Sequence, residues 1–531
     1  MGVMKTERIP SQRDLSLDRP SPHGHAIAWV LTVLALTGAY YTFVALGADR
    51  DIWQQAGGAF GIQMASFALA SLLLGWGRHW NSPRPSDPGM IFLLWASCYL
   101  IYPSGYWIRG GPLLFDEYLS SAGRVILQGH AVFLVAFMVM FLAVSGRKYW
   151  TPPEIDTRNL PNAGLLLSIP IGVLIVVAGL RWATTGTVVA SHNYGDTVFA
   201  IGSQIQSARA GGGLDYFIVQ VLLRVSFFPF LALGIGGGIV GAKALKARKG
   251  RTAWIFLLFG ISVLCLVLGV ATRSGALMVI LIAVFLTDML TGLVRWRFFL
   301  PVLLVILSVF VFFQFFREIN QEGLGTAVKH SASQVGLSNN GQLNEFTFML
   351  SKEAVGERYF AQRPDGPVMV VRDALSLIPS QLMPSKLAST WAETGDVLAI
   401  NMIGASQFAK GGGVGGAVLA DGFRIGGGPW GVCLIAVIFA SILGAFVRWM
   451  TALPEKGPQL LRVALSAGYL AWIFLFIRGD LQIVLSVTLY NLVVPWLILK
   501  FALDEYAAAR WLRPMPSAAK GRSIESSPHT V

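Results

Sequence analysis

The chain is poor in charged residues and in cysteine. Only 13% of its 531 residues are Asp, Glu, Lys or Arg, whereas 54% are hydrophobic and the mean hydropathy is +0.61. A string of soluble domains does not have this composition. The three cysteines, Cys98, Cys265 and Cys433, all fall in apolar runs. We therefore expect neither a disulfide framework nor a thiolate metal site.

Several familiar signatures are also missing from the sequence. The apolar stretches are continuous runs of about 18 to 24 residues, not the short alternating segments of a membrane barrel, so they predict helices. No glycine-rich segment precedes a GK[ST] triplet or follows a strand-like run, so no nucleotide-binding loop is predicted. The first 25 residues are polar and basic. The apolar run after them lacks an obvious cleavage site, so we expect no signal peptide.

The apolar runs predict an all-α polytopic integral membrane protein with about twelve transmembrane helices. The spans are expected at 26–46, 56–76, 89–107, 124–145, 163–180, 215–241, 252–271, 274–294, 298–316, 429–447, 461–477 and 482–502. The predicted organisation is an N-terminal tail (1–25), helices one to nine (26–316), a large loop with short helices (317–428), helices ten to twelve (429–502) and a largely disordered polar tail (503–531).

The net charge of +13 follows from this topology. Basic residues collect in alternate loops, as in the cluster from Lys243 to Arg251, and the positive-inside rule then places both termini in the cytoplasm. The large loop lies on the opposite face of the membrane. A nucleic-acid partner is therefore not required to explain the charge. The chain shows no matching halves, which argues against an inverted-repeat transporter.

A second set of arginines lies on the outer face, where the positive-inside rule does not require them. Arg273 lies in the turn "TRSG", and Arg478 and Asp480 lie in "FIRGDLQIV". The other members of the set are Arg181, Arg209, Arg224 and Arg317. Such arginines can reach lipid headgroups or cap helix ends. Alternatively, their planar guanidinium groups bind an anionic, phosphorylated ligand in a bidentate way.

The large loop supplies the candidate proton acceptors. We single out Asp421, Glu393 and His330, although spacing alone does not select one of them. The two outside histidines, His192 and His330, have no partner at metal-ligand spacing, so no metal site is predicted. The glycine-rich pieces "KGGGVGG" and "RIGGGPWG" either let the backbone approach a ligand closely or act as connectors and helix breaks.

Four segments together resemble the bacterial oligosaccharide repeat-unit polymerases, the Wzy-type O-antigen and exopolysaccharide polymerases. They are "ATRSGALMVIL", "IPSQLMPSK", "GGAVLADGFRIGGGPWGV" and "FIRGDL", and the resemblance covers roughly residues 250–500. Before the tenth span this chain has Asp421 where that pattern leads us to expect a glutamate.

The resemblance implies a GT-C-like helical fold in the bacterial inner membrane, with the large loop in the periplasm. It implies a glycosyltransferase without a cofactor that polymerises repeat units carried on undecaprenyl pyrophosphate. Arg273 and Arg478 would then clamp the diphosphate with help from Arg317 or Arg424, and Asp480 would orient Arg478. Membrane lipids, a chain-length regulator and a flippase are the further candidate partners.

Three alternatives stay open at the level of sequence. An O-antigen ligase would use the same donor with a different acceptor. A GT-C glycosyltransferase using other lipid-linked sugars would use the acidic pair Asp49 and Asp51 in "GADRDIW" as a base or as metal ligands. A transporter or flippase for anionic solutes would also fit a chain of this many spans.

Overall fold

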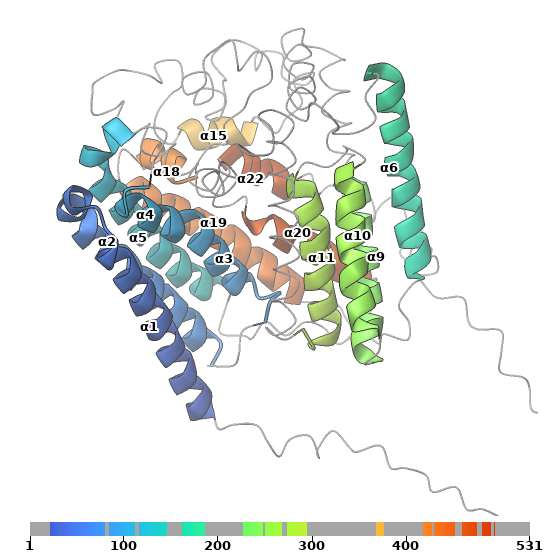
Figure 1. Ribbon diagram of the computed structural model, residues 1–531, viewed down its shortest axis with the longest axis horizontal. Coiled ribbons are helices and arrows are strands. Elements are labelled where there is room, and N and C mark those ends of the chain that lie inside the picture. The colour runs from blue at the N-terminus through green and yellow to red at the C-terminus, as the bar shows by residue number, and fades with distance from the viewer. Residues whose placement is uncertain are drawn as a thin grey trace, which may run out of the picture.

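The computed structural model of the chain is entirely helical over the residues that it describes (Figure 1). These are residues 22–79, 84–111, 116–145, 162–185, 227–247, 250–267, 273–294, 368–375, 418–426, 429–451, 459–474, 481–489 and 493. The helices of the first half are α1 (Pro22–Leu46), α2 (Arg50–Gly77), α3 (Pro88–Ala96), the π-helical segment η2 (Ser97–Ile101), α4 (Tyr102–Ile108), α5 (Asp116–Ser145), α6 (Ala163–Thr185), α9 (Phe227–Lys246), α10 (Arg251–Val267) and α11 (Arg273–Thr291). The second half contributes α15 (Val368–Leu375), α18 (Val418–Gly426), α19 (Pro429–Thr451), α20 (Gln459–Ala471), the 3-10 turn η5 (Trp472–Phe474) and α22 (Leu481–Thr488).

Five helical segments are long and apolar enough to cross a membrane: Gly24–Leu46, Arg50–Gly77, Pro88–Ile108, Gly123–Ser145 and Pro429–Thr451. Shorter apolar helices lie at Ala163–Val176, Arg251–Cys265, Leu277–Thr291 and Leu460–Ala471. Helix α1 exposes large side chains such as Leu31, Leu36 and Leu46, which suits contact with lipid better than contact with water. The protein is therefore membrane-embedded, as the composition predicts.

Helices lie on the predicted spans wherever the structure describes them. The ninth predicted span, 298–316, lies outside the described residues, and so does most of the loop 317–428. In the loop, α15 is one of the short helices that the sequence predicts there. The count of twelve crossings and the GT-C-like arrangement stay predictions.

Local sequence explains several helix boundaries. Asp49 caps α2, because its Oδ1 accepts hydrogen bonds from the amides of Asp51 at 3.0 Å and Ile52 at 3.1 Å. Asp87 caps α3 in the same way, and Pro88 fills the first helical position, where no amide hydrogen is needed. Gly292 follows the end of α11 with φ +62°, a conformation that residues with a side chain rarely adopt.

The core is formed by close packing of helices that are distant in sequence. Helix α5 packs against both α2 and α19, and α11 packs against α9 and α20. Phe92 of α3 stacks on Phe137 of α5 with 3.6 Å between ring centroids, and both rings are fully buried. Helix α9 approaches α11 through its glycines, since a Cβ on Gly234 would lie 2.6 Å from Ile282 Cβ.

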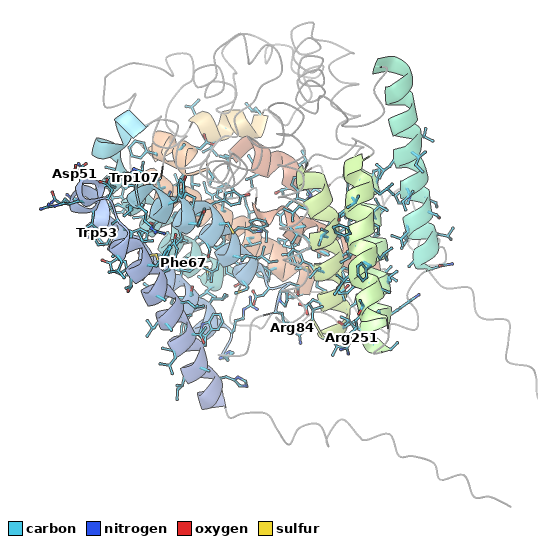
Figure 2. All side chains as sticks on the ribbon, viewed as in Figure 1. Asp51, Trp53, Phe67, Arg84, Trp107 and Arg251 are labelled. Atoms are coloured by element: carbon cyan, nitrogen blue, oxygen red, sulfur yellow. The ribbon has the colours of Figure 1, made fainter. Side chains whose placement is uncertain are left out.

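The bundle has two distinct ends (Figure 1). The helices α15, α18 and α22 lie at its upper end in this view. Arg84 and Arg251 lie at its lower end, whereas Asp51 and Trp107 lie towards the upper end (Figure 2). We use the names upper end and lower end in this sense.

Candidate functional site

Asp421 is a buried acid at the upper end of the bundle. It lies in α18, which packs against α19 and also contacts α15 and α5. Asp421 is 0% exposed, and the preceding residues Val418 and Ala420 are fully buried as well. The protein thus holds an acid inside an otherwise apolar layer, where a charge needs compensating hydrogen bonds.

The main chain of α22 supplies such a hydrogen bond. The amide of Leu481, the first residue of α22, donates to Asp421 Oδ2 with an N–O distance of 2.8 Å. Amides in the first turn of a helix have no partner within the helix, and a carboxylate there is favoured by the helix dipole. This contact joins two of the segments that carry the family resemblance, "GGAVLADGFRIGGGPWGV" and "FIRGDL", across 60 residues of sequence.

Glycines fix α18 against α19. A Cβ on Gly422 would lie 3.0 Å from both the carbonyl oxygen of Gly431 and the Cα of Val432. A Cβ on Gly431 would clash with the backbone of Gly422 and Gly426. In "DGFRIGGGPWG", these described glycines therefore serve a close approach between two helices of the protein itself. Close packing between two helices is a role that neither interpretation of the second glycine-rich piece included.

Arg273 is the first residue of α11. Gly292, just beyond the other end of α11, would place a Cβ 3.1 Å from the guanidinium of Arg84, and Arg84 is labelled at the lower end (Figure 2). Helix α11 therefore begins at the upper end, so Arg273 shares that end with Asp421. The predicted turn "TRSG" is thus partly helical, since Arg273 and the residues after it belong to α11.

The other predicted site residues are described only in part. Arg424 lies in α18 with Asp421, and Arg181 lies in α6, a helix that packs against α9. The residues that lie outside the described part of the chain are Glu393, His330, Arg317, Arg478, Asp480 and Arg209. Arg478 and Asp480 nevertheless directly precede Leu481, whose amide meets Asp421.

Asp49, the first residue of the acidic pair near the start of α2, has a structural role. Asp49 caps this helix through its side chain, and its amide donates to the carbonyl of Ile108 at 2.8 Å. Beside it, the guanidinium of Arg109 lies 4.0 Å from the centre of the Phe43 ring. Among the described residues, no three His, Cys, Asp or Glu side chains form a group that could hold a metal ion.

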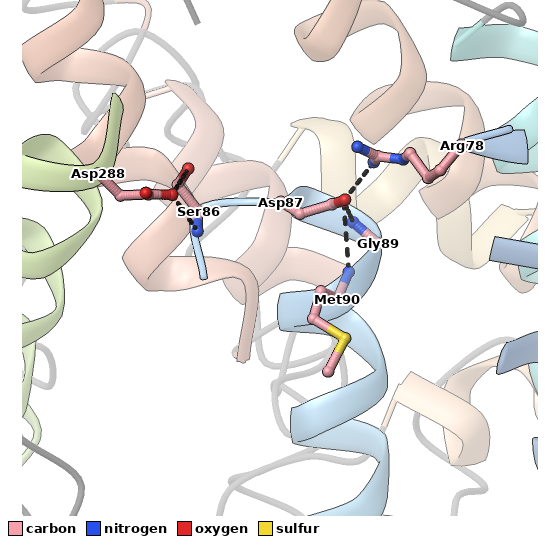
Figure 3. Close-up of polar contacts among 6 residues, drawn as sticks. All are labelled: Arg78, Ser86, Asp87, Gly89, Met90 and Asp288. Atoms are coloured by element: carbon pink, nitrogen blue, oxygen red, sulfur yellow. Dashed lines mark hydrogen bonds and ion pairs between the residues drawn. The ribbon is translucent and has the colours of Figure 1, made fainter. Parts of the chain in front are cut away.

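Sequence reasoning missed a buried polar cluster at the lower end (Figure 3). Asp288 of α11 is 0% exposed, and its Oδ2 accepts hydrogen bonds from the amide of Ser86 at 3.2 Å and the hydroxyl of Ser86 at 2.6 Å. Arg78 pairs with Asp87, whose Oδ1 also accepts the amide of Gly89 at 2.9 Å. Burial raises the pKa of the Asp87 carboxyl, and the Arg78 guanidinium acts in the opposite direction. An acid such as Asp288 inside an apolar run was the available signal.

A second buried polar group lies between α2, α4 and α5. Gln63 Nε2 lies 3.1 Å from Ser104 Oγ and 2.8 Å from His130 Nδ1, and it donates to the carbonyl of Leu100 at 3.2 Å. Leu100 belongs to the π-helical segment, in which carbonyl oxygens are displaced from regular helical partners. The group therefore compensates an irregular stretch of helix inside the bundle.

Comparison of the chain with protein-family models, with curated proteins and with solved structures gives no match.

Proposed function

We propose that the chain is a membrane glycosyltransferase that polymerises undecaprenyl-pyrophosphate-linked oligosaccharide repeat units, for O-antigen, capsule or exopolysaccharide synthesis. It would act at the periplasmic face of the bacterial inner membrane. The observation that carries the proposal is the hydrogen bond between Asp421 and the Leu481 amide, because it brings together two segments on which the resemblance rests. Arg273, in a third such segment, begins α11 at the same end of the bundle.

The proposed reaction is a nucleophilic substitution at the anomeric carbon of a sugar. A hydroxyl oxygen of the incoming repeat unit forms a bond to the anomeric carbon of the growing chain. The bond from that carbon to the phosphate oxygen breaks, and undecaprenyl pyrophosphate leaves with the bonding electrons. The proton of the attacking hydroxyl passes to a protein base, for which Glu393 and His330 are the candidates beside Asp421.

The arginines would stabilise the charge that develops on the departing diphosphate. Arg273 and Arg478 are the principal candidates, with Arg317 and Arg424 beside them. Arg273 begins a helix, so the partial positive charge of that helix terminus adds to its own charge. Removing one preorganised donor of this kind commonly costs about 10²- to 10³-fold in rate.

The test uses the full chain reconstituted in vesicles. The probe is the undecaprenyl-pyrophosphate-linked oligosaccharide extracted from cells in which the gene has been deleted, added without metal or nucleotide. We expect a ladder of products that differ by one repeat unit. We expect Arg273→Ala and Arg478→Ala to lower the rate by about 10²- to 10³-fold.

Arg84→Ala is the matched control, because Arg84 lies at the opposite end of the bundle (Figure 2). It should leave the ladder unchanged. Wild-type protein that produces no ladder would overturn the proposal. Normal ladders from well-expressed Arg273→Ala and Arg478→Ala proteins would overturn the diphosphate clamp.

A further inference from the structure

Three basic side chains lie together where α9 ends and α10 begins. Lys243 and Lys246 belong to the last turn of α9, and Arg251 is the first residue of α10. Arg251 is labelled at the lower end of the bundle in Figure 2. Both lysines are exposed and Arg251 is partly buried. We call these three residues the basic cluster.

The backbone brings the cations of the two helices close to each other. Gly250, directly before Arg251, has φ +77°, a conformation that glycine adopts without strain. A Cβ on Gly250 would lie 3.9 Å from the Cβ of Ala244, the residue after Lys243. Higher in the pair, Trp254 Nε1 donates to the Gly237 carbonyl at 3.0 Å. The start of α10 is therefore held beside the last turn of α9, and the three cations share one place.

The described side chains give the surface of the lower end a positive charge. The described acids of this end are Asp87 and Asp288, and both are 0% exposed. Their carboxylates point to partners inside the protein, as Figure 3 shows. An anionic partner would therefore approach this end without meeting an exposed described carboxylate.

Helix α10 exposes aromatic side chains above the basic cluster. Phe256 is 69% exposed and Phe259 40% exposed, and residues three apart lie on the same side of a helix. Since an α-helix rises 1.5 Å per residue, Phe256 lies about 7.5 Å and Phe259 about 12 Å along the axis from Arg251. The surface is thus positive at the end of the helix pair and apolar from there towards the middle of the bundle.

This order of charge and apolar surface matches a phospholipid better than a soluble anion. A glycerophospholipid carries its phosphate at the membrane surface, and its acyl chains extend from there into the bilayer. Lys and Arg side chains at the surface attract anionic headgroups. The exposed aromatic rings would contact acyl chains, whereas a soluble anion would leave them in contact with nothing that it can offer.

We infer that the lower end of α9 and α10 binds an anionic phospholipid, with its phosphate at the basic cluster and its acyl chains along Phe256 and Phe259. This site is separate from the proposed polymerase site at the upper end, and lipid binding there does not require polymerase activity.

The first experiment measures lipid affinity by native mass spectrometry of the full chain in detergent. The probes are phosphatidylglycerol and phosphatidylcholine with identical acyl chains. Both carry the phosphate, but the choline group cancels its charge. A Lys or Arg near an anionic lipid contributes about fivefold to binding, so the first phosphatidylglycerol should bind at least about tenfold more tightly than the first phosphatidylcholine. Soluble glycerol 3-phosphate at the same concentration should not displace it.

The second experiment removes charge from the basic cluster. The double variant Lys243→Gln with Lys246→Gln should weaken the binding of phosphatidylglycerol by about 5- to 25-fold and leave that of phosphatidylcholine unchanged. The matched control is Arg50→Gln with Arg448→Gln, which removes two exposed cations from α2 and α19. The control should leave both affinities at the wild-type value.

The third experiment tests the contact with the acyl chains. Phe256→Ala should weaken the binding of both lipids by the same factor, about 3- to 10-fold, because apolar contact area is lost whichever headgroup is present. The preference for phosphatidylglycerol should therefore persist. Leu36→Ala is the matched control, since Leu36 is 68% exposed on α1. It should change neither affinity. Size-exclusion chromatography in detergent checks the fold of every variant.

Four outcomes would overturn the inference. They are equal wild-type affinities for the two phospholipids, a charge control that loses as much affinity as the lysine variant, wild-type binding by Phe256→Ala, and displacement of the lipid by a soluble anion. Displacement by glycerol 3-phosphate would indicate a site for soluble phosphates, and displacement by polyglutamate a site for an acidic protein. None of these measurements uses polymerisation, so failure of the lipid site and failure of the proposed function are distinguishable.

Discussion

Each end of the bundle has a buried aspartate that accepts a main-chain amide, and the two aspartates hold different parts of the protein. At the upper end, Asp421 on α18 accepts the amide of Leu481. At the lower end, Asp288 on α11 accepts the amide and hydroxyl of Ser86 (Figure 3). Both carboxylates are fully buried, and both join segments distant in sequence, by 60 and by 202 residues.

The surroundings of the two acids differ. Asp288 meets the connection between α2 and α3, where the pair of Arg78 and Asp87 lies close by. Asp421 meets a helix that directly follows a segment with an arginine of the proposed site. A buried aspartate in a membrane bundle is therefore not by itself a sign of catalysis, and what it fixes in place decides its importance for function.

We expect the largest loss of stability from a substitution in the glycine contact between α18 and α19 at the upper end. Gly431→Ala would drive a Cβ into the backbone of Gly422 and Gly426, so α18 must move away from α19. We expect a loss of about 3 kcal/mol in stability, at the upper range for overpacking. Polymerase activity per folded molecule should fall too, because α18 carries Asp421. Unfolding by denaturant in detergent and the vesicle assay measure the two effects.

Gly260→Ala is the control for this substitution. Gly260 lies inside α10, and a Cβ there would meet nothing within 4 Å. Alanine should be neutral or stabilise the helix by about 0.5 to 1 kcal/mol. If Gly431→Ala behaves like Gly260→Ala, the close packing of α18 on α19 is wrong.

An intermediate effect is expected at the lower end. Asp288→Ala leaves the amide and hydroxyl of Ser86 without their acceptor, at a cost of about 2 kcal/mol in unfolding free energy. Activity per folded molecule should stay at the wild-type value, unlike that of Asp421→Ala. Asp288→Asn, which keeps an acceptor, should recover most of the stability. Loss of activity in a stable Asp288→Asn protein would remove the distinction between the two ends.

Much of the helical architecture could be predicted from the sequence, because apolar runs and capping residues are local signals. The runs at 26–46 and 429–447 predict α1 and α19, and Asp87 before Pro88 is an ordinary start of a helix. The π-helical segment at Ser97–Ile101 could not be predicted. Its Leu100 carbonyl accepts a hydrogen bond from Gln63 of another helix, and such a contact between helices is not a local signal.

The sequence predicts which segments contribute to the candidate site, but not the contacts between them. Charge placement selected Arg273, and Asp421 was one of three candidate proton acceptors in the large loop. The structure puts both at the upper end. One partner of Asp421 is a main-chain amide, and a main-chain group leaves no mark in a sequence. The same holds for Asp288, whose partner Ser86 is an unremarkable polar residue in a connection. The spacing of residues in a sequence identifies candidate side chains. Which of them become partners depends on which helices pack together in the fold.

We expect the smallest loss of stability from substitution of Asp49, in the acidic pair of the alternative GT-C mechanism. Asp49→Ala should cost about 1 kcal/mol, the usual value of a helix cap, whereas Asp49→Asn keeps a side-chain acceptor and should cost less. Both variants should polymerise at the wild-type rate, because the described contacts of Asp49 are those of a cap and of a main-chain bond to Ile108. An inactive Asp49→Asn protein with a normal unfolding midpoint would move the site to this part of the upper end. The substrates to test would then be lipid-linked sugars of another kind instead of the diphosphate-linked repeat unit. In that mechanism an acid, and not an arginine, contacts the substrate.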